Sequence, residues 1–329
     1  MAFSFICALL LGLGSSVWAN EPESVGPRSE EETQFLLRES REAFDSGRAD
    51  DAARLLKRLV SRYPSHPEMA KSQLLLGKSL TVLGKPKEAI PHLLRAIEAW
   101  GNQPDGVAAR LPLGRAYLAA ADPRAALVVV RELTQGPAGK KASAEVLSEA
   151  LQIQAYAHLA LKKETDARRD LHSLVVSAAA ANTAGQPLPP TILAETAWLE
   201  LKLKSNECAR LPAPGRMEEG QARVQMERRG TCVQEAVLFA LRTADAEPLA
   251  WAPKAAASLS DILKGFERAC RNPPVPPGAR SSTQLKKYRQ ELVQHLLPLC
   301  EKAWVAARAS IPDEHVLRKA FEPWADLKK

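Results

Sequence analysis

Small residues recur every 37 positions through the first half of the chain, and this interval constrains the fold more than any other feature of the sequence. Three columns carry it: an alanine column (Ala52, Ala89, Ala126), a turn column (Gly47, Gly84, Ala121) and a column of small side chains (Ser40, Gly77, Gly114). Larger apolar residues fill two more columns (Leu56, Leu93, Val130 and Leu37, Leu74, Leu111). A chain that repeats in this way stacks copies of one small unit, each of which contacts mainly its neighbours.

The repeated unit has the sequence of a helical hairpin. Residues 50–60 place apolar side chains at helical spacing, and the segment stops at Tyr63 and Pro64. Gly47 and Gly84 stand at chain reversals, which favour a residue that tolerates left-handed backbone. We expect the alanines where two helices approach closely. Because the apolar residues are mostly Ala, Leu and Val, composition also favours an all-α fold.

This pattern resembles the tetratricopeptide repeat family, whose first helix carries Leu-Gly with a tyrosine three residues later, and whose second helix begins near an alanine. The third unit matches at Leu113, Gly114, Tyr117 and Ala126, the second at Leu76, Gly77, Gly84 and Ala89, and the first at Gly47, Ala52 and Pro64. Arg62-Tyr63-Pro64-Ser65 followed by Leu76-Gly77 is similar to members from the bacterial cell envelope. The resemblance implies an α-solenoid whose concave face binds a partner helix or peptide.

The repeats depart from the family in three ways, one of which is that the early aromatic residue of the family's first helix is missing. Their period exceeds the usual interval of about 34 residues, and Pro112 stands near the start of the third unit's first helix, where it would shorten or kink that helix. A fourth unit fits residues 143–178, with Ala155 and Ala167 in the packing columns after a register shift of four. We therefore predict a repeat domain of about four hairpins over residues 20–178.

The second half of the chain is predicted to be a helical C-terminal region or cap, residues 191–329, after a linker at residues 179–190. Helical patterns fit residues 191–204, 216–228, 231–244, 254–270, 282–309 and 313–327. This half is either a set of degenerate repeats or a distinct cap, which solenoids need at their ends.

The N-terminus indicates export. Residues 1–19 carry no charge, and the run from Ile6 to Leu13 has the length of a secretion signal but is too short to span a bilayer. Small residues before Asn20 suit signal-peptidase cleavage there. We predict a signal peptide at residues 1–19 and a periplasmic mature chain, the alternative being a buried N-terminal helix.

Four cysteines remain after cleavage: Cys208, Cys232, Cys270 and Cys300. An even number in an exported protein permits disulfide bonds, with three possible pairings. Pairing of neighbours, Cys208 with Cys232 and Cys270 with Cys300, would close two short loops. Free buried thiols are the alternative, and zinc is disfavoured because no two cysteines share the spacing of a zinc knuckle.

No residue pattern predicts catalysis, a cofactor or a metal. Gly77-Lys78-Ser79 resembles the end of a phosphate-binding loop, but Ser72 stands where the first glycine is required. The six histidines are scattered, and the helical pattern explains the carboxylates without an acid–base pair. We predict that the chain is not an enzyme; the alternative is a site in the second half, around Cys270, Cys300 and His295.

Two surfaces are candidates for binding. Outward positions of the first helices predict a groove near Gln73, Lys78, Arg110 and Arg115. A basic cluster, which is otherwise read as a solvated helix face, comprises Arg271, Arg280, Lys286, Lys287 and Arg289. The sequence thus predicts an exported interaction scaffold, without nucleic acid, that binds a protein partner and associates peripherally with a membrane or envelope complex. The alternative is a structural subunit of an envelope assembly that acts through its C-terminal region.

Overall fold

The computed structural model describes residues 27–321, except for 138, 140–141, 212–218 and 272–280. Within these ranges the chain is helical and contains no strand. The predicted signal peptide at residues 1–19 lies outside them. No helix in the described part combines the length and the apolar character that crossing a bilayer requires.

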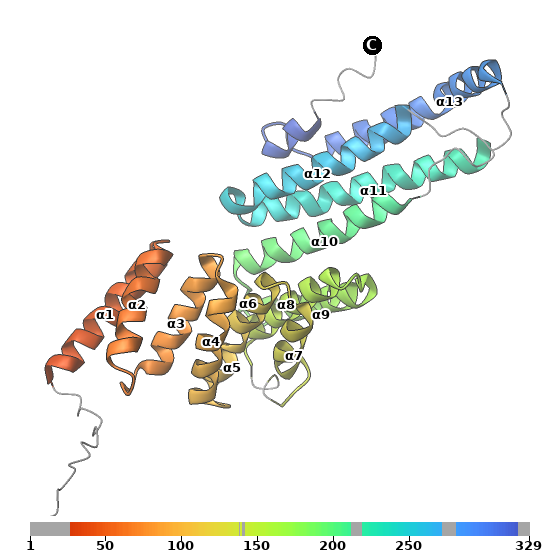
Figure 1. Ribbon diagram of the computed structural model, residues 1–329. Helices are drawn as coiled ribbons and strands as arrows, with labels where there is room; N and C mark the ends of the chain where they lie inside the picture. The colour runs from red at the N-terminus through yellow and green to blue at the C-terminus, as the bar shows by residue number, and fades with distance from the viewer. Residues whose placement is uncertain (1–26, 138, 140–141, 212–218, 272–280, 322–329) are drawn as a thin grey trace, which may run out of the picture.

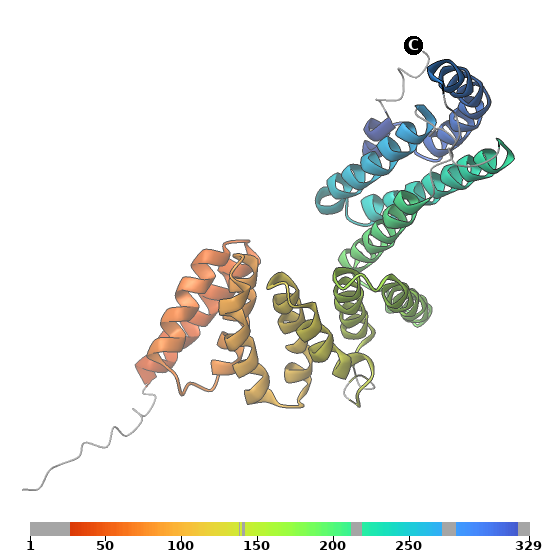
Figure 2. The same ribbon diagram turned by 45° about the vertical axis from the view of Figure 1, so that its right-hand side comes forward.

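Helices α1 to α9 form four antiparallel hairpins that stack side by side into an arc (Figures 1 and 2). The first helices of the hairpins are α1 (Pro27–Asp45), α3 (Met69–Val82), α6 (Arg110–Ala119) and α8 (Ala144–Ala160). The second helices are α2 (Ala49–Arg62), α4 (Pro86–Trp100), α7 (Pro123–Thr134) and α9 (Glu164–Thr183). This arrangement confirms the all-α solenoid that the repeat predicted.

The alanine column lies where the hairpins close. Ala52, Ala89 and Ala126 are fully buried, and Ala167 is the equivalent residue of the fourth hairpin. The shift of four residues before the fourth hairpin falls in the connection between α7 and α8, so the hairpin itself is preserved. Connections inside the hairpins are uniformly short, and the residues that lengthen the period lie between hairpins.

Pro112 has the predicted effect on the third hairpin. Its first helix is split at Ala109 into a short α5 (Pro104–Ala108) and α6. Proline has no N–H to donate to the carbonyl four residues earlier, and its ring crowds that carbonyl. The remaining α6 is consequently shorter than α3 or α8.

The turn column adopts left-handed backbone in every hairpin. The φ angle is 77° at Gly47, 71° at Gly84, 61° at Ala121 and 60° at Lys162. The same pair of hydrogen bonds closes each of these helix ends: Ala121 N–H donates to the carbonyl of Leu118, and the following N–H donates to the carbonyl of Tyr117. The third and fourth hairpins therefore hold a side chain in a conformation that favours glycine.

Replacing Ala121 with glycine is expected to raise the free energy of unfolding by about 0.5–1 kcal/mol. The change removes the strain of a Cβ at positive φ, and this gain exceeds the cost of glycine's greater freedom in the unfolded chain. Gly84→Ala, the matched reverse change, should lower the stability by a similar amount. Urea-induced unfolding followed by circular dichroism measures both. A loss of stability in Ala121→Gly would contradict the role assigned to the turn.

The second half is a four-helix bundle of α10 (Pro190–Arg210), α11 (Glu219–Ala246), α12 (Pro248–Arg271) and α13 (Ser282–Ala309). The predicted linker is shorter than expected, since α9 continues through the alanine-rich residues 178–181 to Thr183. The predicted break between residues 228 and 231 is wrong: α11 runs through it, and Gly230 instead allows close approach to Ala303 of α13.

Helix α10 joins the two halves by packing on both. Its Leu199 and Leu203 lie one turn apart and pack against α8 and α9 in a cluster with Leu171. Leu201 faces the opposite way and belongs to the core of the bundle. A helix that is apolar on opposite sides is buried on both, and α10 is accordingly shared between the arc and the bundle (Figure 1).

Candidate functional site

A hollow of about 460 Å³ opens between α3 and α6, on the side of the arc that is lined by the first helices of the hairpins. We call it the α3–α6 hollow. Its lining combines apolar and charged side chains: Lys71, Leu74, Lys78, Trp100, Asp105, Ala108, Ala109, Leu111, Pro112, Arg115 and Glu149. It has the composition of a surface that can receive an apolar side chain beside a charged one.

Two of the predicted groove residues, Lys78 and Arg115, line this hollow. The ammonium group of Lys78 lies 5.5 Å from the centre of the Phe44 ring. Among the described residues it has no carboxylate within ion-pair distance. A cation held against an aromatic face but without an anion is available to a carboxylate of a partner.

Arg115 is engaged within the protein. Its guanidinium nitrogens lie 3.4 Å from carboxylate oxygens of Glu149 and Glu195, which come from α8 and α10. Burial opposes the charge, but Glu195 and Glu149 hold the pKa of Arg115 above its usual value. Burial, together with Glu195, also raises the pKa of Tyr156. Arg115 therefore anchors α10 to the third hairpin at the edge of the hollow.

The other two predicted groove residues lie elsewhere. Gln73 is only 5% exposed, and its Oε1 atom lies 2.6 Å from Nδ1 of His92 between α3 and α4. The prediction that Gln73 faces outward is wrong, because this polar side chain has a polar partner inside the hairpin. Arg110 donates to the backbone carbonyl of Gly106 and to Asn102, and so ties α6 to the turn that holds α5.

Comparison with known families identifies the region around the hollow. The sequence model of the tetratricopeptide repeat matches residues 37–104 and again residues 74–140, starting points that differ by the interval of the repeat. Residues 37–140 are tetratricopeptide repeats. Such repeats generally mediate contacts between proteins and are not catalytic.

Among solved structures, a tetratricopeptide repeat protein from Parabacteroides merdae is similar over 89% of this chain and 98% of its own, at 14% identity and a TM-score of 0.42. No curated protein matched the chain.

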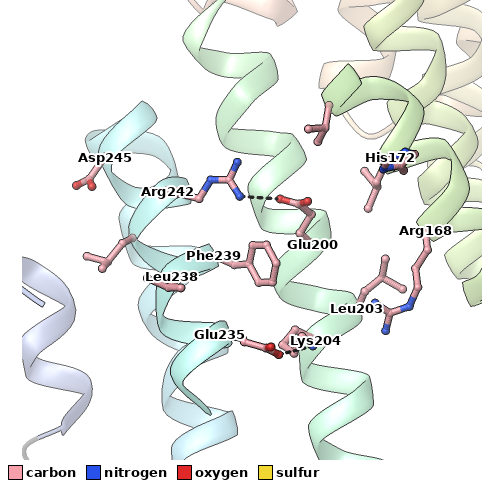
Figure 3. A pocket seen from close by; sticks show the side chains of 13 residues that line it. Arg168, His172, Glu200, Leu203, Lys204, Glu235, Leu238, Phe239, Arg242 and Asp245 are labelled. Atoms are coloured by element: carbon pink, nitrogen blue, oxygen red, sulfur yellow. Dashed lines mark ion pairs between the residues drawn. The ribbon is translucent and has the colours of Figure 1, made fainter. Parts of the chain in front are cut away.

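A larger cleft, of about 710 Å³, lies beyond the matched tetratricopeptide repeats and is lined by α9, α10 and α11 (Figure 3). We call it the α9–α11 cleft. Its lining is mainly apolar, with charged groups interspersed: Arg168, Leu171, His172, Val175, Glu200, Leu203, Lys204, Glu235, Leu238, Phe239, Leu241, Arg242 and Asp245. It lies outside the surface that the tetratricopeptide repeats would use.

The described part of the predicted basic cluster is partly neutralised by its own helices. Arg271 lies 2.8 Å from a carboxylate oxygen of Glu267, and Lys287 lies 3.9 Å from one of Glu291. Lys286 lines a hollow of about 510 Å³ near the start of α13, which also carries Arg289. Arg280 lies outside the described residues. Binding of this cluster to an anionic surface stays a prediction.

The cysteines pair as neighbours. Cys208 of α10 and Cys232 of α11 are bonded, as are Cys270 of α12 and Cys300 of α13. Both bridges hold the bundle, and the described residues contain no group of His, Cys, Asp and Glu that could hold a metal ion.

The α9–α11 cleft was not among the surfaces predicted from the sequence. A signal was present in α11, where Leu238, Phe239 and Leu241 widen the apolar arc beyond the buried stripe that includes Val233 and Val237. A helix that packs on one neighbour needs only one such stripe, so the excess marks a second apolar surface.

Proposed function

We propose that this protein is an exported interaction scaffold of the bacterial cell envelope, and that its tetratricopeptide repeats bind a helix or extended peptide of a partner protein in the α3–α6 hollow. The observation that carries the proposal is the position of this hollow, whose lining apart from Glu149 falls within residues 37–140, on the side lined by the first helices of the repeats. No covalent chemistry is involved: the surface is preformed by packing.

The chemistry of the hollow defines the partner more closely. Leu74, Trp100 and Leu111 offer apolar contact, and Lys78 offers a positive charge without a carboxylate partner among the described residues. A segment with an apolar residue one turn from an aspartate or glutamate would satisfy both. Such a contact combines desolvation with charge complementarity, and the latter contributes mainly to selectivity.

Two observations support export. The uncharged apolar segment at residues 1–19 has the length of a signal sequence. Paired cysteines in the bundle suit an oxidising compartment, since disulfide bonds are rare in reducing ones. An N-terminus at Asn20 in protein purified from the periplasm, read by mass spectrometry, is the expected result.

The function is tested by charge reversal at Lys78. We expect Lys78→Glu to weaken binding of the partner by about tenfold or more, which corresponds to about 1.4 kcal/mol. The substitution places a negative charge where the partner's carboxylate binds. A photo-crosslinking amino acid at Leu74, introduced in the native cell, captures the partner and gives the readout.

Two matched controls lie on α4, outside the hollow. Lys87→Glu makes the same charge change at an exposed position, and a crosslinker at Leu94 replaces an exposed leucine. If Lys87→Glu reduced crosslinking of the partner as much as Lys78→Glu does, the hollow would be rejected as the binding site. The same holds if a crosslinker at Leu94 captured as much partner as one at Leu74.

A further inference from the structure

The α9–α11 cleft has the shape of a groove between two parallel walls. Contacts of Arg168 with Glu207 and of Glu164 with Arg210 show that α9 and α10 are antiparallel. The ion pair of Lys204 with Glu235 and the Cys208–Cys232 bond show the same for α10 and α11. Helices α9 and α11 therefore run in the same direction, with α10 as the floor between them.

The groove is long enough for a short helix. Its lining on α11 extends from Glu235 to Asp245, which corresponds to about 15 Å of helix axis. On α9 the lining residues 168, 171, 172 and 175 follow the spacing of one helical face. A third helix placed between these walls could interlock with both over about three turns.

Apolar side chains are exposed along this groove. Leu238 on the α11 wall is 54% exposed, and Val175 on the α9 wall is also exposed, while Leu171 and Leu203 form a buried base. Exposed apolar residues gathered in one concavity mark a surface that another molecule covers. The cleft volume lies in the range of preformed binding sites.

The α11 wall is fixed to the α10 floor before any partner arrives. Arg242 lies 3.6 Å from Glu200 and Lys204 lies 2.7 Å from Glu235, and Figure 3 shows Phe239 between these two ion pairs. The Cys208–Cys232 bond joins the same two helices. A preformed groove costs little ordering entropy when it is filled.

The Glu200–Arg242 pair is the longest ion pair of the groove, and it leaves the carboxylate of Glu200 without a hydrogen-bond donor among the described residues. Its side chain is 21% exposed, and within the described structure its only charged contact is Arg242 at 3.6 Å, beyond hydrogen-bond distance. Burial raises the pKa of this carboxyl, although Arg242 opposes the shift. Glu200 is only partly buried, so its carboxylate can accept a hydrogen bond from a donor that enters from the open side of the groove.

We propose that the α9–α11 cleft binds an amphipathic helix of a partner protein, which packs an apolar stripe against Val175 and Leu238 and directs a lysine or arginine to Glu200. The site is distinct from the α3–α6 hollow and does not depend on the function proposed for it. The scaffold thus has two separate surfaces, and the second selects a basic amphipathic helix.

A stapled helical peptide of about 14 residues, labelled with fluorescein, is the probe. It carries leucines at i, i+4 and i+7 and a lysine at i+3, and a second version has glutamate in place of lysine. Fluorescence anisotropy with the full mature chain should show that the lysine peptide binds at least about tenfold more tightly than the glutamate peptide. Glu200→Gln, which keeps the shape of the side chain, should abolish that preference.

Leu238→Glu should weaken binding of the lysine peptide by about tenfold or more, because it places a charge in the apolar wall of the groove. Leu249→Glu is the matched control, since Leu249 is 96% exposed at the start of α12 and lies outside the groove. The proposal is overturned if the lysine peptide does not bind up to about 1 mM, if Glu200→Gln keeps the lysine preference, or if the two leucine variants bind alike.

Discussion

Gly77→Val is expected to lower the free energy of unfolding of the repeat region by about 3 kcal/mol, the upper part of the range for overpacking a core. A Cβ at Gly77 would overlap Cγ of Leu93 and lie 2.6 Å from Cδ2 of the same side chain. Leu93 is fully buried in the cluster that joins the first three hairpins. Neither the side chain nor the helix can move away without opening that cluster.

Gly265 supplies the matched control. It also lies inside a helix, α12, but a Cβ there would meet nothing within 4 Å. Gly265→Val should therefore change stability by less than about 0.5 kcal/mol, since only helix propensity is affected. Urea-induced unfolding compares the two variants, and a similar loss in both would show that Gly77 is not required by close packing.

The repeat predicted the arc because its columns correspond to contacts that recur. Ala52, Ala89 and Ala126 are equally buried, and the left-handed turn persists at Ala121 even without glycine. The burial and backbone conformation of such positions depend only on contacts within a hairpin and with the next one. The sequence alone was therefore sufficient to predict the hairpins and their order.

Predictions failed where a residue's partner lies in another element. Gln73 is polar on a helix and was expected to face outward, but His92 satisfies it inside the hairpin. Two helices were expected over residues 216–228 and 231–244, but α11 runs through the interval between them, where Gly230 makes room for Ala303. A polar residue on a helix can face solvent or a buried polar partner, and a glycine can end a helix or allow close packing. Only the element that packs against the residue determines which of the two occurs.

The apolar excess on α11 indicates a second surface, but the sequence alone does not locate the α9–α11 cleft, because three helices contribute to it from positions between Arg168 and Asp245. No short interval relates Leu171, Glu200 and Leu238. Their proximity follows from α10, which packs on the arc through one face and on the bundle through the other. The hollow between α3 and α6, in contrast, lies between adjacent repeats, and Lys78 and Arg115 were predicted to be there.

Removing both disulfide bonds should destabilise the C-terminal bundle and leave the arc unchanged. The bonded cysteines are 24 and 30 residues apart, and loops of that size correspond to about 3 kcal/mol of stabilisation for each bond. Both bonds join helices of the bundle, whereas the described hairpins contain no cysteine. Loss of both bonds then lowers the stability of the bundle by about 6 kcal/mol, which is comparable to the whole stability of a small domain.

The test compares the oxidised wild-type protein with Cys208→Ala/Cys232→Ala, with Cys270→Ala/Cys300→Ala and with the variant that combines all four changes. Thermal unfolding followed by circular dichroism should separate into two transitions, of which only the lower one moves with each pair removed. A reducing agent should shift the wild-type bundle to the same extent and have no effect on the combined variant. Mass spectrometry after alkylation reports the thiols, so an unshifted transition in fully reduced wild-type protein would show that chain cross-linking does not stabilise the bundle. Complete alkylation of the purified protein without a reducing agent would show instead that the cysteines are free.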